Sequence, residues 1–241
     1  GMFYHALKRH DSLVALFEAY LERRPKDADA YFFKGLGHQE QGRLQAAYRA
    51  YVEGLDRMAP EAQRFMQAIF MLVDGTDLKR GVQLPDESAL GQFWKGRDPL
   101  FLTSVNERLM EHCRRVAYAN LRFSDPTRSI AGWQTDRGQV YIRYGKPLSR
   151  YMKPGDIDLG LDKTTSEEAN RPRGSSGVHY DVQHRTETWG YEGVEITFEN
   201  TTSWDSWRFI RAWDGHKTLE WGELIERFPE SYRHPWIYEA P

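Results

Sequence analysis

The spacing of apolar residues changes along this chain, and that change limits the folds open to it. In the first third, apolar residues recur at intervals of three and four, as at Leu13, Leu16 and Phe17. This is the period of helices with one buried face. In the last third they alternate with polar residues, as at Val194 and Ile196, which is typical of half-buried strands. Helices followed by strands at hairpin spacing predict an α+β fold.

Four helices are expected in the first 75 residues. The first begins after a cap at Asp11 or Ser12 and ends before Pro25, because these residue types stop and start helices. The next three are expected at about 28–41, 44–58 and 61–73. Such short connections favour antiparallel neighbours.

Residues 11–73 resemble a tetratricopeptide repeat. The residues that carry the resemblance are Tyr31, Gly35, Gly42, Ala47, Tyr51 and Pro60. Lys34 departs from the pattern, because an apolar residue is usual at its position. The segment holds about one and a half repeats, whereas about three are needed for a stable stack. We therefore expect it to pack against the rest of the chain, or to have lost repeats upstream.

The resemblance also implies a candidate peptide groove. The positions that line the groove in such repeats fall on Asp29, Phe32, Leu36, Gln39 and Glu40. If the groove is open, an apolar patch should surround Phe32 and Leu36 and bind a protein or peptide partner. The alternative is that the chain's own fourth helix, or its second part, fills this face.

The second part of the chain is expected to form an α+β domain over 76–241, after a linker at about 76–92. A long helix is predicted from Asp98 to about Leu121, and its charged residues are expected on a solvated face. The predicted sheet has about four antiparallel strands, at Gln139–Tyr144, Thr186–Tyr191, Val194–Glu199 and Trp207–Trp213. A loop is expected at about 152–178, and a last helix capped by Thr218.

The pentapeptide Gly132-Trp133-Gln134-Thr135-Asp136 lies between the long helix and the first predicted strand. With its flanks, over about residues 90–215, it resembles the GWxTD domain, a bacterial family without an established activity. The resemblance therefore supplies no catalytic residues. Relatives are often exported, which favours the bacterial envelope or periplasm over the cytoplasm.

Two interpretations of the pentapeptide remain open. In the first it is a structural corner, because Gly132 permits an unusual backbone, Trp133 is large and apolar, and Thr135 and Asp136 bond to turns. In the second, Asp136 belongs to a polar ligand or catalytic site. The residues of that candidate site are Asp136, Arg137, Glu107, Arg108 and Arg115.

Composition excludes several classes of function. A net charge of -2 gives no basic surface for nucleic acid, and no apolar run is long enough to span a membrane. Cys113 is the only cysteine, so no disulfide within the chain is possible. His179, Asp181 and His184 are more readily explained as exposed loop residues than as metal ligands. No cofactor is expected, and the oligomeric state is not predicted.

These observations favour a non-enzymatic protein-interaction or assembly module, without a recognisable catalytic site. The rival is an enzyme or small-ligand binder with its site around Asp136 and Arg137. A third reading is a structural spacer within a longer chain. The late tryptophans, six of which follow residue 185, are expected mainly in the core, with stacking on sugars or peptides as the alternative.

Overall fold

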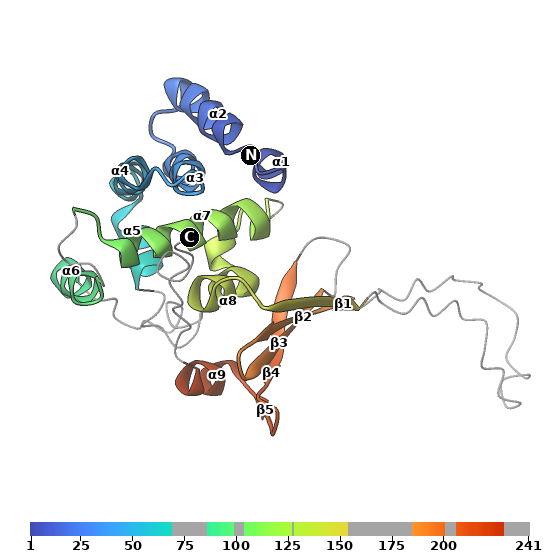
Figure 1. Cartoon of the computed structure of the whole chain (residues 1–241). Helices are drawn as coiled ribbons and strands as arrows, with labels where there is room; N and C mark the ends of the chain where they lie inside the picture. Colours follow the sequence, from blue (N-terminus) through green and yellow to red (C-terminus); the bar gives the residue numbers. More distant parts are fainter. Residues whose placement is uncertain (69–85, 99–103, 127, 154–184, 201–205, 229–241) are drawn as a thin grey trace, which may run out of the picture.

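A computed structural model describes residues 1–68, 86–98, 104–126, 128–153, 185–200 and 206–228. Within these ranges the chain forms nine α-helices, one short 3-10 helix and five strands (Figure 1). Most helices precede the strands, so the predicted α+β class is confirmed.

The first five helices are α1 (Met2–Ala6), α2 (His10–Arg23), α3 (Ala28–Gln39), α4 (Leu44–Leu55) and α5 (Pro60–Gln67). The expected cap of α2 at Asp11 or Ser12 is wrong, because α2 begins at His10 without a side-chain cap. α3 begins after Asp27, whose carboxylate accepts a hydrogen bond from the Ala30 amide. Gly42, with φ of +73°, makes the turn between α3 and α4.

Two further helices differ from their predicted bounds. The end of the expected linker, 87–92, belongs to α6 (Glu87–Gly96), which Asp86 caps by accepting from the Ala89 amide. The long helix α7 (Glu107–Phe123) begins after Asn106 rather than at Asp98. The Asn106 side chain accepts from the Leu109 amide at 2.7 Å, so the cap lies eight residues later than expected.

The strand predicted at 139–144 is wrong, because these residues belong to helix α8 (Asp136–Tyr144). Thr135 caps the helix by accepting from the Gly138 amide, and Gly145 ends it with φ of +74°. Every residue from 137 to 144 is buried. A helix without an exposed face shows no helical period in its sequence, and its apolar residues happen to alternate.

The sheet is antiparallel with strands in chain order, β1 (Ser149–Lys153), β2 (Arg185–Tyr191), β3 (Val194–Asn200), β4 (Trp207–Trp213) and β5 (Thr218–Leu219). Three of the four predicted strands are therefore confirmed. Thr218 lies in β5, so it does not cap a helix; α9 (Trp221–Arg227) begins after Glu220. Residues 152 and 153 belong to β1, and the rest of the expected 152–178 loop lies outside the described residues.

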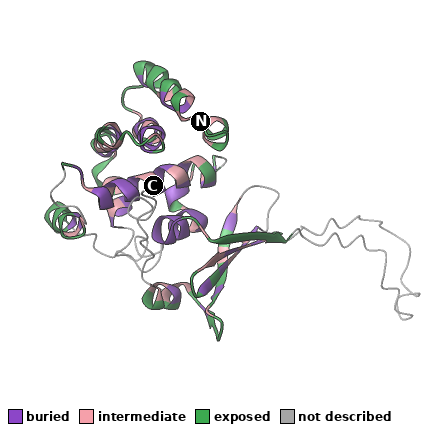
Figure 2. Ribbon diagram, in the orientation of Figure 1, coloured by how far each residue is buried: buried purple, intermediate pink, exposed green. Residues whose placement is uncertain are grey.

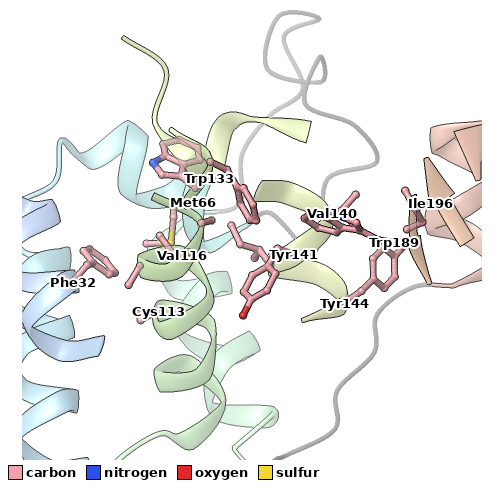
Figure 3. Packing of buried hydrophobic residues seen from close by; sticks show 14 of the residues in the cluster. Phe32, Met66, Cys113, Val116, Trp133, Val140, Tyr141, Tyr144, Trp189 and Ile196 are labelled. Atoms are coloured by element: carbon pink, nitrogen blue, oxygen red, sulfur yellow. The ribbon is translucent and has the colours of Figure 1, made fainter. Parts of the chain in front are cut away.

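The elements pack in layers around a main core, and a separate smaller cluster joins α2 to α3. In Figure 3 the core runs from Phe32 on α3, through Cys113 on α7, to Tyr141 on α8 and Trp189 on the sheet. α3 packs against α2, α4 and α7, so the N-terminal helices pack against the rest of the chain, the first of the two expected arrangements. α8 and α9 lie on one side of the sheet (Figure 1). We call that side the inner face and the opposite side the outer face.

Candidate functional site

The first three residues of the pentapeptide form the 3-10 helix, η1 (Gly132–Gln134), that leads into α8. A Cβ at Gly132 would lie 1.9 Å from the Ala119 carbonyl oxygen, and one at Gly138 would lie 1.8 Å from the Gly132 carbonyl oxygen. Only glycine fits where backbone segments approach this closely. The two glycines therefore let η1 pack directly on α7 and α8.

Trp133 joins three parts of the molecule. Its side chain is buried, and the centre of its ring lies 5.1 Å from the centre of the Phe65 ring on α5. Its backbone amide donates to the Asn120 side-chain oxygen at 3.0 Å, and the Asn120 amide nitrogen donates to Asp29 at 2.8 Å. Asn120 therefore holds Trp133 to α7, and its bond to Asp29 connects the same site to α3.

Asp136 fastens the start of α8 to the sheet. Its carboxylate accepts a hydrogen bond of 2.7 Å from the backbone amide of Phe209 on β4. Burial raises the pKa of this carboxyl, while the Phe209 amide acts in the opposite direction. The last residue of the pentapeptide therefore connects α8 to β4.

Arg137 belongs to a cluster of charged residues on the inner face of the sheet. It donates to Glu187 at 3.1 Å, and Arg150 donates to the other oxygen of the same carboxylate. The Arg137 guanidinium also lies 4.8 Å from the ring centre of Trp207. Burial acts to raise the pKa of Glu187, but hydrogen bonding with Arg150 and the two arginine charges outweigh it and lower that pKa.

Arg115 lies at the opposite end of α8. It donates to the carbonyls of Ile142 and Arg143, both at 3.0 Å, which places positive charge at the helix C-terminus. Glu111 holds Arg115 at 2.8 Å and binds Arg114 with both oxygens. Burial acts to raise the pKa of Glu111, but the charges and hydrogen bonds of these arginines lower it to about 2.

The structure does not bring the five residues of the candidate polar site together. Asp136 and Arg137 start α8, whereas Arg115 binds its end, about 12 Å away for a nine-residue helix. Glu107 and Arg108 lie at the start of α7, with the Arg108 guanidinium 5.7 Å from the Trp94 ring centre. All but Asp136 are buried, so the expected solvated face of α7 is wrong.

The open peptide groove is also wrong. Phe32 is 1% exposed and Leu36 is 0% exposed, and both belong to the main core. The centre of the Phe32 ring lies 5.9 Å from the centre of the Tyr51 ring on α4. Gln39 is buried, and its side-chain oxygen accepts a hydrogen bond from the Tyr51 hydroxyl. Only Asp29 and Glu40 of the five groove residues are exposed. α7, from the second part of the chain, packs on α3 together with α4. Filling by the second part was one of the two alternatives, whereas α4 is the third expected helix and not the fourth.

Sequence reasoning missed Glu187, which holds the buried Arg137. A signal for Glu187 exists, because strand alternation places it with Trp189 on the inner face of β2. A charged residue at an inward position predicts a buried partner. For Glu111 the signal is its i,i+4 spacing to Arg115, which indicates the ion pair that forms at 2.8 Å. The burial of this pair depends on tertiary packing around α7.

The exposed surfaces lie on the sheet instead. All five residues of β1 are exposed, in contrast to the buried α7 and α8 (Figure 2). Tyr151 is 67% exposed and Met152 is 50% exposed. Two late tryptophans, Trp189 and Trp207, are in the core as expected, but Trp213 is 43% exposed on β4. Trp204 and Trp236 lie outside the described residues.

The described part of the chain also bears on metal, thiol and membrane-spanning features. It contains no group of three His, Cys, Asp or Glu side chains able to hold a metal ion. His112 is buried against the Met66 carbonyl, and Cys113 is a buried free thiol. His179, Asp181 and His184 lie outside the described residues. No described helix is both long and apolar enough to cross a membrane.

Comparisons with known proteins add no relative. No family model, curated protein or solved structure matches this chain.

Proposed function

We propose that this chain is a non-enzymatic protein-interaction module that adds an extended segment of a partner protein to its sheet along β1. One observation carries the proposal: among the strands that the structure describes, β1 is an edge strand, and its five residues are all exposed. Edge strands present backbone donors and acceptors that pair with another chain.

The two edges of the sheet differ in length and exposure. The opposite edge, β5, has two residues, and its Leu219 is buried. Short edge strands resist pairing, so β1 is the edge suited to an added strand. Tyr151 and Met152 provide exposed apolar surface on alternate sides of it.

Charge favours an acidic partner over a second copy of the chain. β1 carries Arg150 and Lys153 and no acidic residue. Arg150 is already bound to Glu187, so Lys153 is the charge that β1 leaves for a partner. Two copies paired through β1 would add a second Lys153 and no acidic residue, which disfavours self-association. An extended segment with alternating acidic and apolar residues would complement Lys153 and the exposed Tyr151.

The rival function, an enzyme or ligand binder at Asp136 and Arg137, has less support. Asp136 accepts from a β4 amide and Arg137 binds Glu187, so both groups have structural partners. The proposed bacterial envelope location rests on the GWxTD resemblance alone.

The test uses fluorescently labelled peptides and anisotropy. A peptide of alternating Glu and Val should bind, whereas one of alternating Lys and Val should not. A Glu/Val peptide with proline at its centre should also fail, because proline lacks the N–H that a ladder requires. Lys153→Glu should weaken binding about tenfold, or about 1.4 kcal/mol.

The matched control is Arg208→Glu, a charge reversal at an exposed residue on β4 of the same sheet. It should leave the affinity of the Glu/Val peptide unchanged. Equal binding of the acidic and basic peptides, or full binding by the proline peptide, would contradict the proposal.

A further inference from the structure

A hollow of about 350 Å³ lies on the outer face of the sheet. It is lined by Thr188, Glu195, Thr197, Arg211, Trp213 and Thr218, from four different strands. Its volume falls within the range of small-molecule sites, about 300–1,000 Å³. This hollow is separate from the backbone edge of β1.

Strand register brings the lining residues together. Glu195 pairs with Trp213, and Thr197 pairs with Arg211, across β3 and β4. The hydroxyls of Thr188 and Thr197 are 3.2 Å apart. Residues opposite each other or two apart on one face lie within about 8 Å, so one small ligand could contact several of these groups.

The lining combines an aromatic surface with opposite charges. Trp213 is 43% exposed, whereas Trp189 and Trp207 on the same sheet are buried on the inner face. Glu195 and Arg211 are both exposed, and neither forms an ion pair with another described residue. The acceptors of Glu195 and the donors of Arg211 are therefore available to a ligand.

We propose that this hollow binds a neutral saccharide. One face of a sugar ring is apolar and can stack on the Trp213 indole. Its hydroxyls both donate and accept, so they can bond to Glu195, Arg211 and the threonine hydroxyls together. Because the two charged groups sum to zero, the site has no net charge to attract an ion. This proposal goes beyond the protein-interaction function and does not depend on it.

The competing ligand is a zwitterion, such as a short peptide with free termini, which could pair with both charges. The substitution Glu195→Gln distinguishes binding of a saccharide from binding of a zwitterion. Glutamine keeps a hydrogen-bonding oxygen but loses the charge. A saccharide should therefore tolerate this substitution within a fewfold change, whereas a zwitterion should lose the partner of its ammonium group.

The experiment is a titration of the ¹⁵N-labelled protein, followed by NMR, with maltotriose, cellotriose, N,N′,N″-triacetylchitotriose and, as the zwitterion, trialanine. At least one saccharide should shift the Trp213 indole N–H and the amides of Thr188 and Thr197. Trp213→Ala should weaken that saccharide about tenfold or more. Trp213→Tyr, which keeps an aromatic face, should restore most of the affinity.

Four outcomes would overturn the proposal. Three are shifts with trialanine alone, shifts confined to residues outside the hollow, and saccharide binding that Trp213→Ala leaves unchanged. The fourth is an absence of shifts with all three saccharides. Binding of the Glu/Val peptide to β1 should survive Trp213→Ala, so failure at one site is distinguishable from failure at the other.

Discussion

The two faces of the sheet use the same residue types in opposite ways. On the inner face Glu187 is 0% exposed and bonds to two arginines, and Trp189 is in the core. On the outer face Glu195 and Trp213 are exposed, and Glu195 has no ion-pair partner among the described residues. Glu187 and Glu195 belong to adjacent strands, so the difference comes from the face and not from position in the chain.

This contrast separates structural from functional candidates. A buried charge must be paired, so the inner carboxylates and arginines are committed to holding α7, α8 and the sheet together. Charged and aromatic groups on the outer face, and the β1 residues other than Arg150, are free of that role. Ligands and partners are therefore expected on the sheet surface, and stability is expected to depend on the inner side.

The largest effect is expected from Glu187→Ala. The substitution removes the carboxylate that Arg137 and Arg150 share and leaves Arg137 buried without it. Breaking a buried ion pair costs about 3–5 kcal/mol, measured as the free energy of unfolding in urea. Glu195→Ala on the outer face is the matched control and should cost about 0.5 kcal/mol or less. Similar losses of unfolding free energy in the two variants would contradict the proposed difference between the inner and outer faces.

Glu111→Gln should destabilise the protein in a pH-dependent way. The pKa of Glu111 is lowered from 4.5 to about 2 in the folded state. A lowered carboxyl pKa gives stability that is present above pH 4.5 and is lost as the pH falls toward 2. The loss in Glu111→Gln should be about 3 kcal/mol at pH 7.

Urea unfolding of both proteins at pH 7, 4.5 and 3 measures this difference directly. The gap between wild type and Glu111→Gln should narrow as the pH falls. A gap that stays constant from pH 7 to pH 3 would show that the Glu111 charge does not hold the inner side.

Gly132→Ala tests the close approach of η1 to α7. The added methyl would lie 1.9 Å from the Ala119 carbonyl. Overpacking typically costs about 1–3 kcal/mol, and a backbone neighbour favours the upper end. Gly91→Ala is the matched control, because Gly91 lies in α6 with open space around its Cα. It should leave the melting temperature unchanged or raise it slightly.

The smallest effect on stability is expected from Trp213→Ala. The side chain is 43% exposed at the end of β4, so its loss should change the free energy of unfolding by about 0.5 kcal/mol or less. Thermal unfolding measures this change, with Trp189→Ala as the buried comparison. A large loss from Trp213→Ala would place this tryptophan with the structural residues.

The parts of the fold that show a clean surface period could be predicted. β3 alternates between buried Val194, Ile196 and Phe198 and exposed or half-buried neighbours, and Gly193 marks the hairpin turn. α3 carries its cap at Asp27. In these elements one face is exposed to water and the other is buried, so the spacing of polar and apolar residues indicates which face is buried.

The wrong predictions concern elements whose sequence lacks this spacing of polar and apolar residues. α8 is buried on almost all sides, so alternating apolar residues imitated a strand, although Thr135 and Gly145 carried helix-boundary signals. β1 has no buried side chain and hence no alternation. Phe32 and Leu36 occupy groove positions by repeat register, but α4 and α7 cover them, and that depends on long-range packing.

The most direct test of the account is hydrogen–deuterium exchange with and without the Glu/Val peptide. The account predicts slower exchange of backbone amides in 149–153 and unchanged exchange in β5, at the opposite edge of the sheet. Unchanged exchange in β1 with bound peptide, or slowing centred on α3, would contradict the assignment of β1 as the interaction edge.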